Sequence, residues 1–294
     1  MNEQQVGLLG ATSLVGECLL QQLIRNHYQV TAFSRHPTAQ NHPQVTWQQL
    51  NATKTANIQT GQEIPTWVCT APIWVLSEYF DLLLAYGVRR IVVLSSTSRF
   101  TKDTSFDHNE RKVALQLIEG EELVQKWATT HGIKWIILRP TLIYGYGRDK
   151  NIAEIARFIR RFGFFPIFGS ARGLRQPIHA EDVASACFYA LNTLNLTNRC
   201  YDLTGGETLP YREVVKRVFE ALDRTPRIVT IPLRFFQMAI GGLRWLPRYR
   251  HWTAAMAERM NRDLIFDSSD AKRELNFSPR PFKLTAEDLP SQNR

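Results

Sequence analysis

Residues 7–16 constrain the fold of this chain more than any other segment. They read Gly-Leu-Leu-Gly-Ala-Thr-Ser-Leu-Val-Gly and follow a short apolar start. We expect a strand over 6–9, a tight turn at Gly10 and a helix over about 14–24. Gly16 then lets the helix pack closely against the strand. The first turn of a helix carries unpaired N–H groups and partial positive charge, so the pattern predicts a pyrophosphate site.

The context of this turn favours a dinucleotide. Ser13 stands where a middle glycine is usual, and its small side chain lets a phosphate approach and offers a hydroxyl donor. A second strand over 28–33 ends at Ser34 and Arg35, where an NAD-selective site places a carboxylate. Arg35 can instead pair with the 2′-phosphate of NADP, or it is an ordinary solvated arginine. We therefore expect NADP, with NAD as the alternative.

Apolar, strand-like runs alternate with helical segments through the first half of the chain. Strands are predicted over 66–70, 90–95, 134–138 and 199–203, and helices over 77–86, 109–130, 152–161 and 181–191. Continuous β-branched strands between helices are typical of a parallel sheet that is covered on both faces. The predicted fold is α/β, a Rossmann-type doubly wound sheet with a smaller, mostly helical C-terminal substrate lobe.

The predicted domain division is interleaved. Residues 1–140 form the nucleotide-binding core, and 177–204 return to it, whereas 141–176 and 205–294 form the substrate lobe. Such sheets bind ligands at the carboxyl ends of their strands.

The net charge of +9 favours an anionic partner, but no motif typical of nucleic-acid binding is present. The four cysteines lie apart in apolar settings and lack the spacing of metal ligands. We interpret them as reduced thiols and expect a cytoplasmic protein, in which no signal peptide precedes the first strand. The sequence does not predict the oligomeric state.

Four motifs occur in the order found in one family. The chain resembles the extended and atypical short-chain dehydrogenase/reductase superfamily, specifically its NAD-dependent epimerase/dehydratase group. The motifs cover about the first two thirds of the chain and comprise the glycine turn, Leu94-Ser95-Ser96-Thr97-Ser98, Leu138-Arg139-Pro140-Thr141-Leu142-Ile143-Tyr144-Gly145 and Arg175-Gln176-Pro177-Ile178-His179-Ala180-Glu181-Asp182-Val183-Ala184. The resemblance implies the fold more specifically than it implies a reaction.

The resemblance implies a substrate-facing hydroxyl at Thr97, although a hydroxyl at a strand end also serves backbone groups. The family's tyrosine and lysine, four residues apart on the long helix, are absent. Val113 and Leu117 occupy their positions, and no tyrosine lies between Tyr86 and Tyr144. Lys112 is one residue from the tyrosine position, about 100° around the helix, which favours a solvated lysine.

Two loop tyrosines are alternative proton donors. Tyr144 and Tyr146 follow the strand that ends at Pro140, near the expected nicotinamide, although loop tyrosines often only pack or line a pocket. Tyr144 is our candidate catalytic residue together with Thr97.

The resemblance also implies that Arg175 contacts substrate phosphates, with an ion pair to Glu181 or Asp182 as the alternative. We interpret His179 as a structural histidine at a helix start. In the basic C-terminal lobe, residues 232–251 form an apolar segment with arginines at its ends. This segment is interpreted as a lid or core helix beside a small anionic molecule, and peripheral membrane contact is the alternative.

The expected cofactor contacts lie on the turn and at neighbouring strand ends: Gly10, Thr12, Ser13, Leu14, Val15, Gly16, Ser34, Arg35, Thr70, Ala71, Pro72, Ser95, Ser96 and Pro140. Two functions remain open. One is an oxidoreductase, epimerase or dehydratase acting on a nucleotide sugar or a similar hydroxylated metabolite with an unusual proton donor. The other is a catalytically silent cofactor-binding redox sensor or scaffold protein, which the missing tyrosine and lysine favour. The intact Ser-Ser-Thr segment, Arg175 and the full substrate lobe favour the enzyme, which is the function that we expect.

Overall fold

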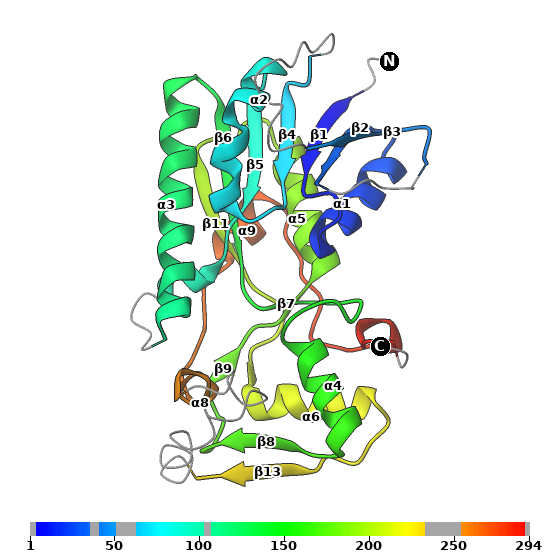
Figure 1. Cartoon of the computed structure of the whole chain (residues 1–294), viewed down its shortest axis with the longest axis vertical. Coiled ribbons are helices and arrows are strands. Elements are labelled where there is room, and N and C mark those ends of the chain that lie inside the picture. Colours follow the sequence, from blue (N-terminus) through cyan, green and yellow to red (C-terminus); the bar gives the residue numbers. More distant parts are fainter. Residues whose placement is uncertain (1–3, 36–40, 51–62, 103–106, 233–253, 292–294) are drawn as a thin grey trace.

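The computed structural model describes residues 4–35, 41–50, 63–102, 107–232 and 254–291. A parallel sheet with helices on both faces forms the upper part of the molecule in Figure 1. A smaller lobe lies beyond the carboxyl ends of its strands, so these ends face the second lobe.

The sheet has seven strands in the order β11-β6-β5-β4-β1-β2-β3, and every neighbouring pair is parallel. Its strands are β1 (Gln5–Leu9), β2 (Gln29–Ser34), β3 (Val45–Gln49), β4 (Thr66–Cys69), β5 (Arg90–Leu94), β6 (Lys134–Pro140) and β11 (Arg199–Leu203). The strand β3 was not predicted, because its half-buried edge position gives it no continuous apolar run.

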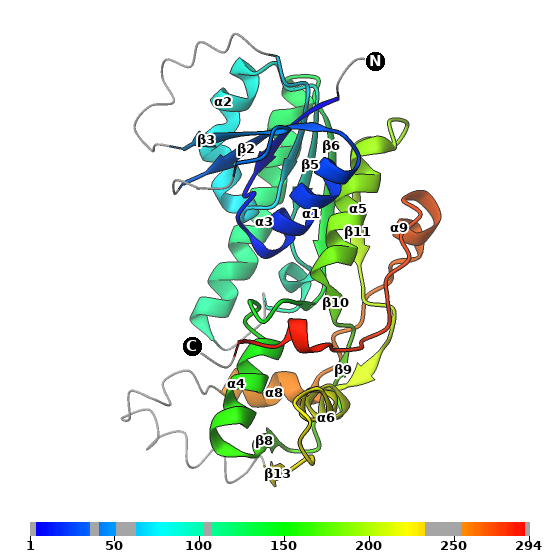
Figure 2. The same ribbon diagram turned by 90° about the vertical axis from the view of Figure 1, so that its right-hand side faces the viewer.

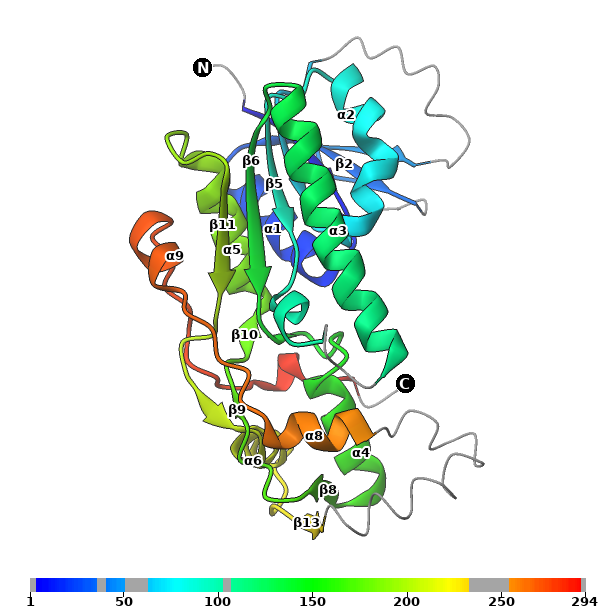
Figure 3. The same ribbon diagram turned by 90° about the vertical axis from the view of Figure 1, so that its left-hand side faces the viewer.

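Helices cover both faces of the sheet (Figures 2 and 3). On one face, α1 (Leu14–Arg25) and α5 (Ala180–Asn192) pack over side chains such as Val6 and Val30. On the other, the 3-10 helix η2 (Ile73–Tyr79), α2 (Phe80–Ala85) and α3 (His108–Thr130) pack over Trp67 and Ile91. The predicted doubly wound α/β fold is therefore confirmed. The helix predicted over 77–86 is divided between η2 and α2.

The second lobe has its own apolar core, in which Phe168 and Phe219 are fully buried. Its elements are β7 (Ile143–Tyr144), α4 (Ile152–Phe162), β8 (Phe165–Phe168), β9 (Leu174–Arg175), β12 (Leu209–Pro210), α6 (Tyr211–Ala221), β13 (Ile228–Ile231) and α8 (Ala254–Asn261). The short β10 (Ile178–His179) pairs with β7 and leads into α5. Within the described ranges, no helix is both long and apolar enough to cross a membrane.

The interleaved domain division stays a prediction, and one segment departs from it. Ala271 of α9 (Ser269–Glu274) and the following Phe277 pack with the core on the α1 side of the sheet, although they were assigned to the second lobe. The apolar segment predicted over 232–251 lies, apart from Pro232, outside the described residues.

A buried carboxylate joins α3 to the lobe-facing edge of the sheet. The side chain of Glu121 is completely buried. It accepts hydrogen bonds from Arg139 Nη2 at 2.6 Å and from Ser95 Oγ at 2.5 Å, and it also pairs with Arg99 of η3 (Thr97–Phe100). The carboxylate of Glu121 therefore links α3 to the end of β5, to η3 and to β6.

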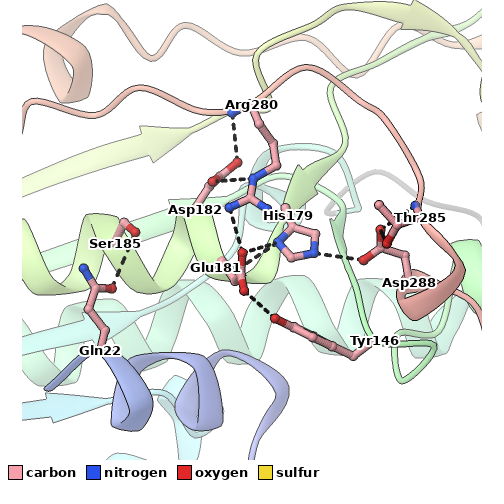
Figure 4. Close-up of polar contacts among 9 residues, drawn as sticks. All are labelled: Gln22, Tyr146, His179, Glu181, Asp182, Ser185, Arg280, Thr285 and Asp288. Atoms are coloured by element: carbon pink, nitrogen blue, oxygen red, sulfur yellow. Dashed lines mark hydrogen bonds and ion pairs between the residues drawn. The ribbon is translucent and has the colours of Figure 1, made fainter. Parts of the chain in front are cut away.

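The last described segment runs back along both lobes. The carboxylate of Asp288, in the short 3-10 helix η5 (Ala286–Asp288), accepts a hydrogen bond from His179 Nε2 at 3.0 Å. His179 also caps α5 by accepting from Glu181 N, as its interpretation as a structural histidine predicts. Arg280 pairs with Glu181 and Asp182 on the same helix (Figure 4).

We expect Glu121→Gln to lower the free energy of unfolding by about 3 kcal/mol, because it leaves two largely buried arginines without their carboxylate. Urea unfolding measures the change. The matched control is Glu63→Gln, which removes a pair with Arg89 in which both side chains are more than half exposed. The control should change stability by less than about 1 kcal/mol. Equal effects of the two variants would contradict the role assigned to Glu121.

The stabilisation by Asp288 should depend on pH. Burial raises the pKa of its carboxyl, but hydrogen bonds from His179 and Thr285 lower it more, to a net value below the ordinary 3.8. Its contribution is therefore complete above about pH 5 and is lost as the pH falls through the lowered pKa. Urea unfolding of the wild type and Asp288→Asn should show a gap in stability that narrows below about pH 4.

The exposed neighbour variant Glu287→Gln serves as the control for this series and should follow the wild type at every pH. A gap between wild type and Asp288→Asn that keeps its full size at low pH would show that the ionised carboxylate is not the stabilising form.

Candidate functional site

The glycine turn starts α1 against the end of β4. Gly10 has a φ of +81°, a conformation that glycine adopts without strain. Ser13 Oγ accepts from Gly16 N at 3.0 Å and donates to Thr70 Oγ1 at 3.0 Å. Thr70 Oγ1 in turn donates to the carbonyl of Gly10 at 2.9 Å. The turn is thus fixed by side chains from its own helix and from the neighbouring strand.

The residues present on this turn fit a dinucleotide pyrophosphate. A Cβ at Gly16 would lie 2.1 Å from the carbonyl oxygen of Gly10, so only glycine permits the close approach of helix and strand. The N–H groups of Leu14 and Val15 begin α1 and have no acceptor in the described part of the chain. The hydroxyl of Ser13 is already donated to Thr70, so its predicted bond to a phosphate would require it to reorient.

The end of β2 carries no carboxylate. Ser34 is buried, whereas Arg35 is exposed directly after the strand. The side chain of Gln49, at the end of β3, donates to the carbonyl oxygen of Arg35 at 3.4 Å. An exposed arginine at this place is compatible with either dinucleotide, so the preference for NADP stays a prediction.

The other predicted cofactor residues follow three adjacent parallel strands. Their common position at the lobe-facing edge arises because these strands run in one direction. Ala71 is so close to the turn that a Cβ on Gly10 would lie 2.5 Å from its backbone nitrogen. The structure brings together at this edge Gly10, Thr12, Ser13, Leu14, Val15, Gly16, Thr70, Ala71, Pro72, Ser95, Ser96 and Pro140.

Thr97 lies at this edge but is buried, with 5% of its surface exposed. Its hydroxyl donates to the carbonyl oxygen of Pro140 at 3.3 Å. The preceding Ser96 caps η3 by accepting from Ser98 N. In the structure both hydroxyls therefore serve protein groups, and the substrate-facing role of Thr97 stays a prediction.

The helix α3 carries apolar side chains at the two positions that the resemblance assigns to a tyrosine and a lysine, and this assignment stays a prediction. Val113 and Leu117 pack into the core on the α3 face of the sheet, in the same cluster as Ala71. Lys112 is exposed, as expected for a solvated lysine. This face of α3 therefore provides packing at the two positions rather than a proton donor.

The two loop tyrosines occupy different surroundings. Tyr144 is fully buried, with its ring edge-on to His179 and Phe282. Burial and the nearby carboxylates of Asp288 and Asp182 raise the pKa of its phenol. Its catalytic role stays a prediction.

Tyr146 is partly exposed and donates to Glu181 of α5 (Figure 4). It borders a cavity of about 390 Å³ that is also lined by Arg280 and Lys283. Its hydroxyl is therefore directed toward α5, on the α1 side of the sheet.

A group of cations lies where α3 and η3 meet the second lobe. Arg259 of α8 pairs with Glu110 at the start of α3. Lys102 follows η3, and burial together with the charge of Arg259 lowers the pKa of its ammonium group. Arg175 is 5% exposed and donates to the carbonyl oxygens of Leu174, Arg262 and Arg259.

Arg175 therefore stabilises the end of α8, and it does not form the alternative ion pair with Glu181 or Asp182, which belong to Arg280. Its contact with substrate stays a prediction. No separate sequence signal indicated Arg259, which is one of many C-terminal arginines. Lys102 was detectable only as a lysine five residues after Thr97.

Comparisons with known proteins agree with this arrangement. Residues 73–202 match the model of the NAD dependent epimerase/dehydratase family. An uncharacterized protein of Sinorhizobium fredii is 25% identical over 92% of this chain and 74% of its own length. A mitochondrial NADH dehydrogenase 1 alpha subcomplex subunit 9 of Arabidopsis thaliana is 27% identical, but over only 33% of this chain and 24% of its own length.

Solved structures share the fold. The UDP-glucose 4-epimerase of Thermotoga maritima, solved with UDP-glucose, superposes with a TM-score of 0.69 at 16% identity and covers 97% of this chain and 95% of its own. The UDP-glucuronic acid 4-epimerase of Bacillus cereus, solved with NAD, gives a TM-score of 0.69 at 14% identity over 97% and 93% of the two chains. Together with the glycine turn and the ordered motifs, the family match supports the resemblance to the NAD-dependent epimerase/dehydratase group of the short-chain dehydrogenase/reductase superfamily, with residues 73–202 as the matched part of the chain.

Proposed function

We propose that the protein binds NADP, or alternatively NAD, and acts as an epimerase/dehydratase-type oxidoreductase on a nucleotide sugar or a similar hydroxylated, anionic metabolite. The observation that carries the proposal is the open first turn of α1, where two N–H groups lack acceptors among the described residues and follow a glycine turn that is fixed by close contacts. We further propose a cytoplasmic location, which the four free thiols support.

The adenosine ribose would lie beside Ser34 and Arg35, and the pyrophosphate on the turn from Gly10 to Gly16. The nicotinamide end would then extend along the edge formed by 70–72, 95–97 and Pro140. This path follows the carboxyl ends of β1, β4, β5 and β6, where ligands of doubly wound sheets bind.

The cations beside α3 support an anionic substrate. Burial lowers the pKa of both Lys102 and Arg259, and the charge of Arg259 lowers the pKa of Lys102 further, so a bound anion would stabilise these charges. Arg175 is a third cation of this group, and it donates to the backbone carbonyl oxygen of Arg259. One of the solved structures contains UDP-glucose and another contains NAD, and a sugar diphosphate has the charge that this group of cations favours.

A nicotinamide supplies hydride transfer when it is bound. Thr97 would orient the reacting oxygen by rotating its hydroxyl away from the carbonyl of Pro140. Proton transfer would depend on a group other than the usual tyrosine, and Tyr144 is the candidate that we propose. Its raised pKa keeps the phenol protonated at neutral pH, so the group does not act as a base there.

A second function has one specific observation in its favour. Val113 and Leu117 replace the proton-transfer pair with side chains that pack into the core, which a cofactor-binding scaffold or redox sensor without turnover tolerates. The partial similarity to a subunit of a mitochondrial NADH dehydrogenase also supports the scaffold alternative.

Ser13→Asp should weaken dinucleotide binding without unfolding α1. Aspartate is a good helix cap, but its carboxylate would repel a pyrophosphate on the turn. Isothermal titration with NADPH and NADH should show a Kd at least about tenfold higher than that of the wild type. Ser13→Asn is the matched neutral cap and should bind more tightly than Ser13→Asp.

Absence of binding of either dinucleotide to the wild type would refute the proposed function. In the same titrations, Arg35→Ala should weaken NADPH and leave NADH unchanged. Tighter binding of NADH by the wild type, unaffected by Arg35→Ala, would overturn only the preference for NADP.

Turnover separates the two functions. With NADP or NAD and a panel of nucleotide sugars, we expect product formation that falls by about a hundredfold in Thr97→Val and Tyr144→Phe. Lys112→Gln changes an exposed residue on α3 and should retain activity. A wild type that binds cofactor but converts no substrate in the panel, with the two variants binding equally well, would favour the scaffold or sensor.

A further inference from the structure

An arginine of the second lobe reaches the glycine turn. Arg148 lies in the loop between β7 and α4 of the second lobe. Its Nη2 donates to the carbonyl oxygen of Thr12 at 3.1 Å, and its Nη1 pairs with Glu17 in the first turn of α1. The guanidinium group is therefore held beside the first turn of α1, where the proposed pyrophosphate would lie.

The backbone of this loop is fixed on both sides of Arg148. Gly145, Tyr146 and Gly147 have φ values of +136°, +55° and +63°. Gly147 N donates to the carbonyl oxygen of Asp288 at 3.0 Å, and a Cβ on Gly147 would lie 2.5 Å from Pro290 Cα. The backbone that carries Arg148 therefore has one defined position before a ligand binds.

The loop continues directly into α4. Asp149 accepts from the backbone nitrogens of Asn151, Ile152 and Ala153, which ties the residue after Arg148 to the start of that helix. The direction of the Arg148 side chain is therefore determined by the second lobe, whereas its partners belong to the first.

The charges around α1 explain what Arg148 does there. Glu17 places a carboxylate one turn from the open N–H groups of Leu14 and Val15, where it repels a phosphate. Arg148 neutralises that carboxylate and retains N–H groups beyond the two that are bonded. A pyrophosphate on the turn would compete with Glu17 for the same guanidinium group.

We propose that Arg148 binds the pyrophosphate of the dinucleotide from the second lobe, and that Glu17 holds it beside the turn when no phosphate is bound. This inference rests on the proposed cofactor binding. It assigns a cofactor contact outside the nucleotide-binding half, through which a bound dinucleotide joins the two lobes.

The test compares two variants of one ion pair. Arg148→Gln should raise the Kd for NADPH and for ADP-ribose by about tenfold, because it removes a charge-assisted contact to phosphate. Glu17→Gln should bind both ligands at least as tightly as the wild type, because it removes the competing carboxylate. Titration calorimetry at two salt concentrations should also show weaker salt dependence for Arg148→Gln than for the wild type.

Arg273→Gln is the control of equal charge change. Arg273 pairs with Asp270 and Glu274 on α9 and is 65% exposed, so its loss should leave both Kd values unchanged. Thermal unfolding of each variant shows whether the fold is retained. If the wild type binds neither ligand, the proposed function fails.

If the wild type binds and Arg148→Gln binds equally well, only the inference is overturned. If Arg148→Gln and Glu17→Gln weaken binding alike, the pair acts as a structural link between the lobes, which also overturns it.

Discussion

The close contact between the glycine turn and Thr70 is the constraint on which the rest of the site depends. Helix α1 can start beside β4 only because Gly16 leaves the carbonyl of Gly10 in place. Thr70 and Ser13 then use their hydroxyls on each other and on the turn. These bonds leave the N–H groups of the first turn directed away from protein acceptors, at the edge of the sheet that faces the second lobe.

Charged contacts join the two lobes on both sides of this edge. On the α3 side, Arg259 pairs with Glu110, and on the α1 side, Arg148 pairs with Glu17. The second pair is nearly half exposed, and such pairs contribute little to stability. The buried contact between His179 and Asp288 contributes more to holding the lobes together, because neither group is accessible to water. Arg148 can therefore exchange Glu17 for a ligand with little loss of stability.

The sequence was most informative where local pattern and burial coincide. Long β-branched runs such as 90–94 and 134–138 are central strands buried on both faces, and the glycine turn has its predicted strand, turn and helix. The edge strand β3 escaped prediction because water reaches most of its side chains. Pairings of two residues, such as β7 with β10, have too little sequence to be detected.

The polar contacts of the site were harder to predict, because they join distant parts of the chain. Arg148 follows a glycine-rich loop and reads as an ordinary loop residue, while its partner Glu17 lies 131 positions earlier. Arg175 was recognised through its motif, but the motif did not show that its guanidinium group caps α8. The residue type predicts that a charge is present at a site. Which carbonyl or carboxylate oxygen this charged group contacts depends on how the lobes pack together.

The titrating groups around the strand ends favour binding over base catalysis. A base must lose its proton near neutral pH, yet burial raises the pKa of Tyr144 and of Tyr146. The pKa of Lys102 moves in the opposite direction, and its charge lies beside that of Arg259. Both cations are stabilised by an anion rather than by a proton acceptor. In the proposed function, a phosphate group of the substrate would therefore interact with these cations, and the chemistry would depend mainly on the cofactor and on Thr97.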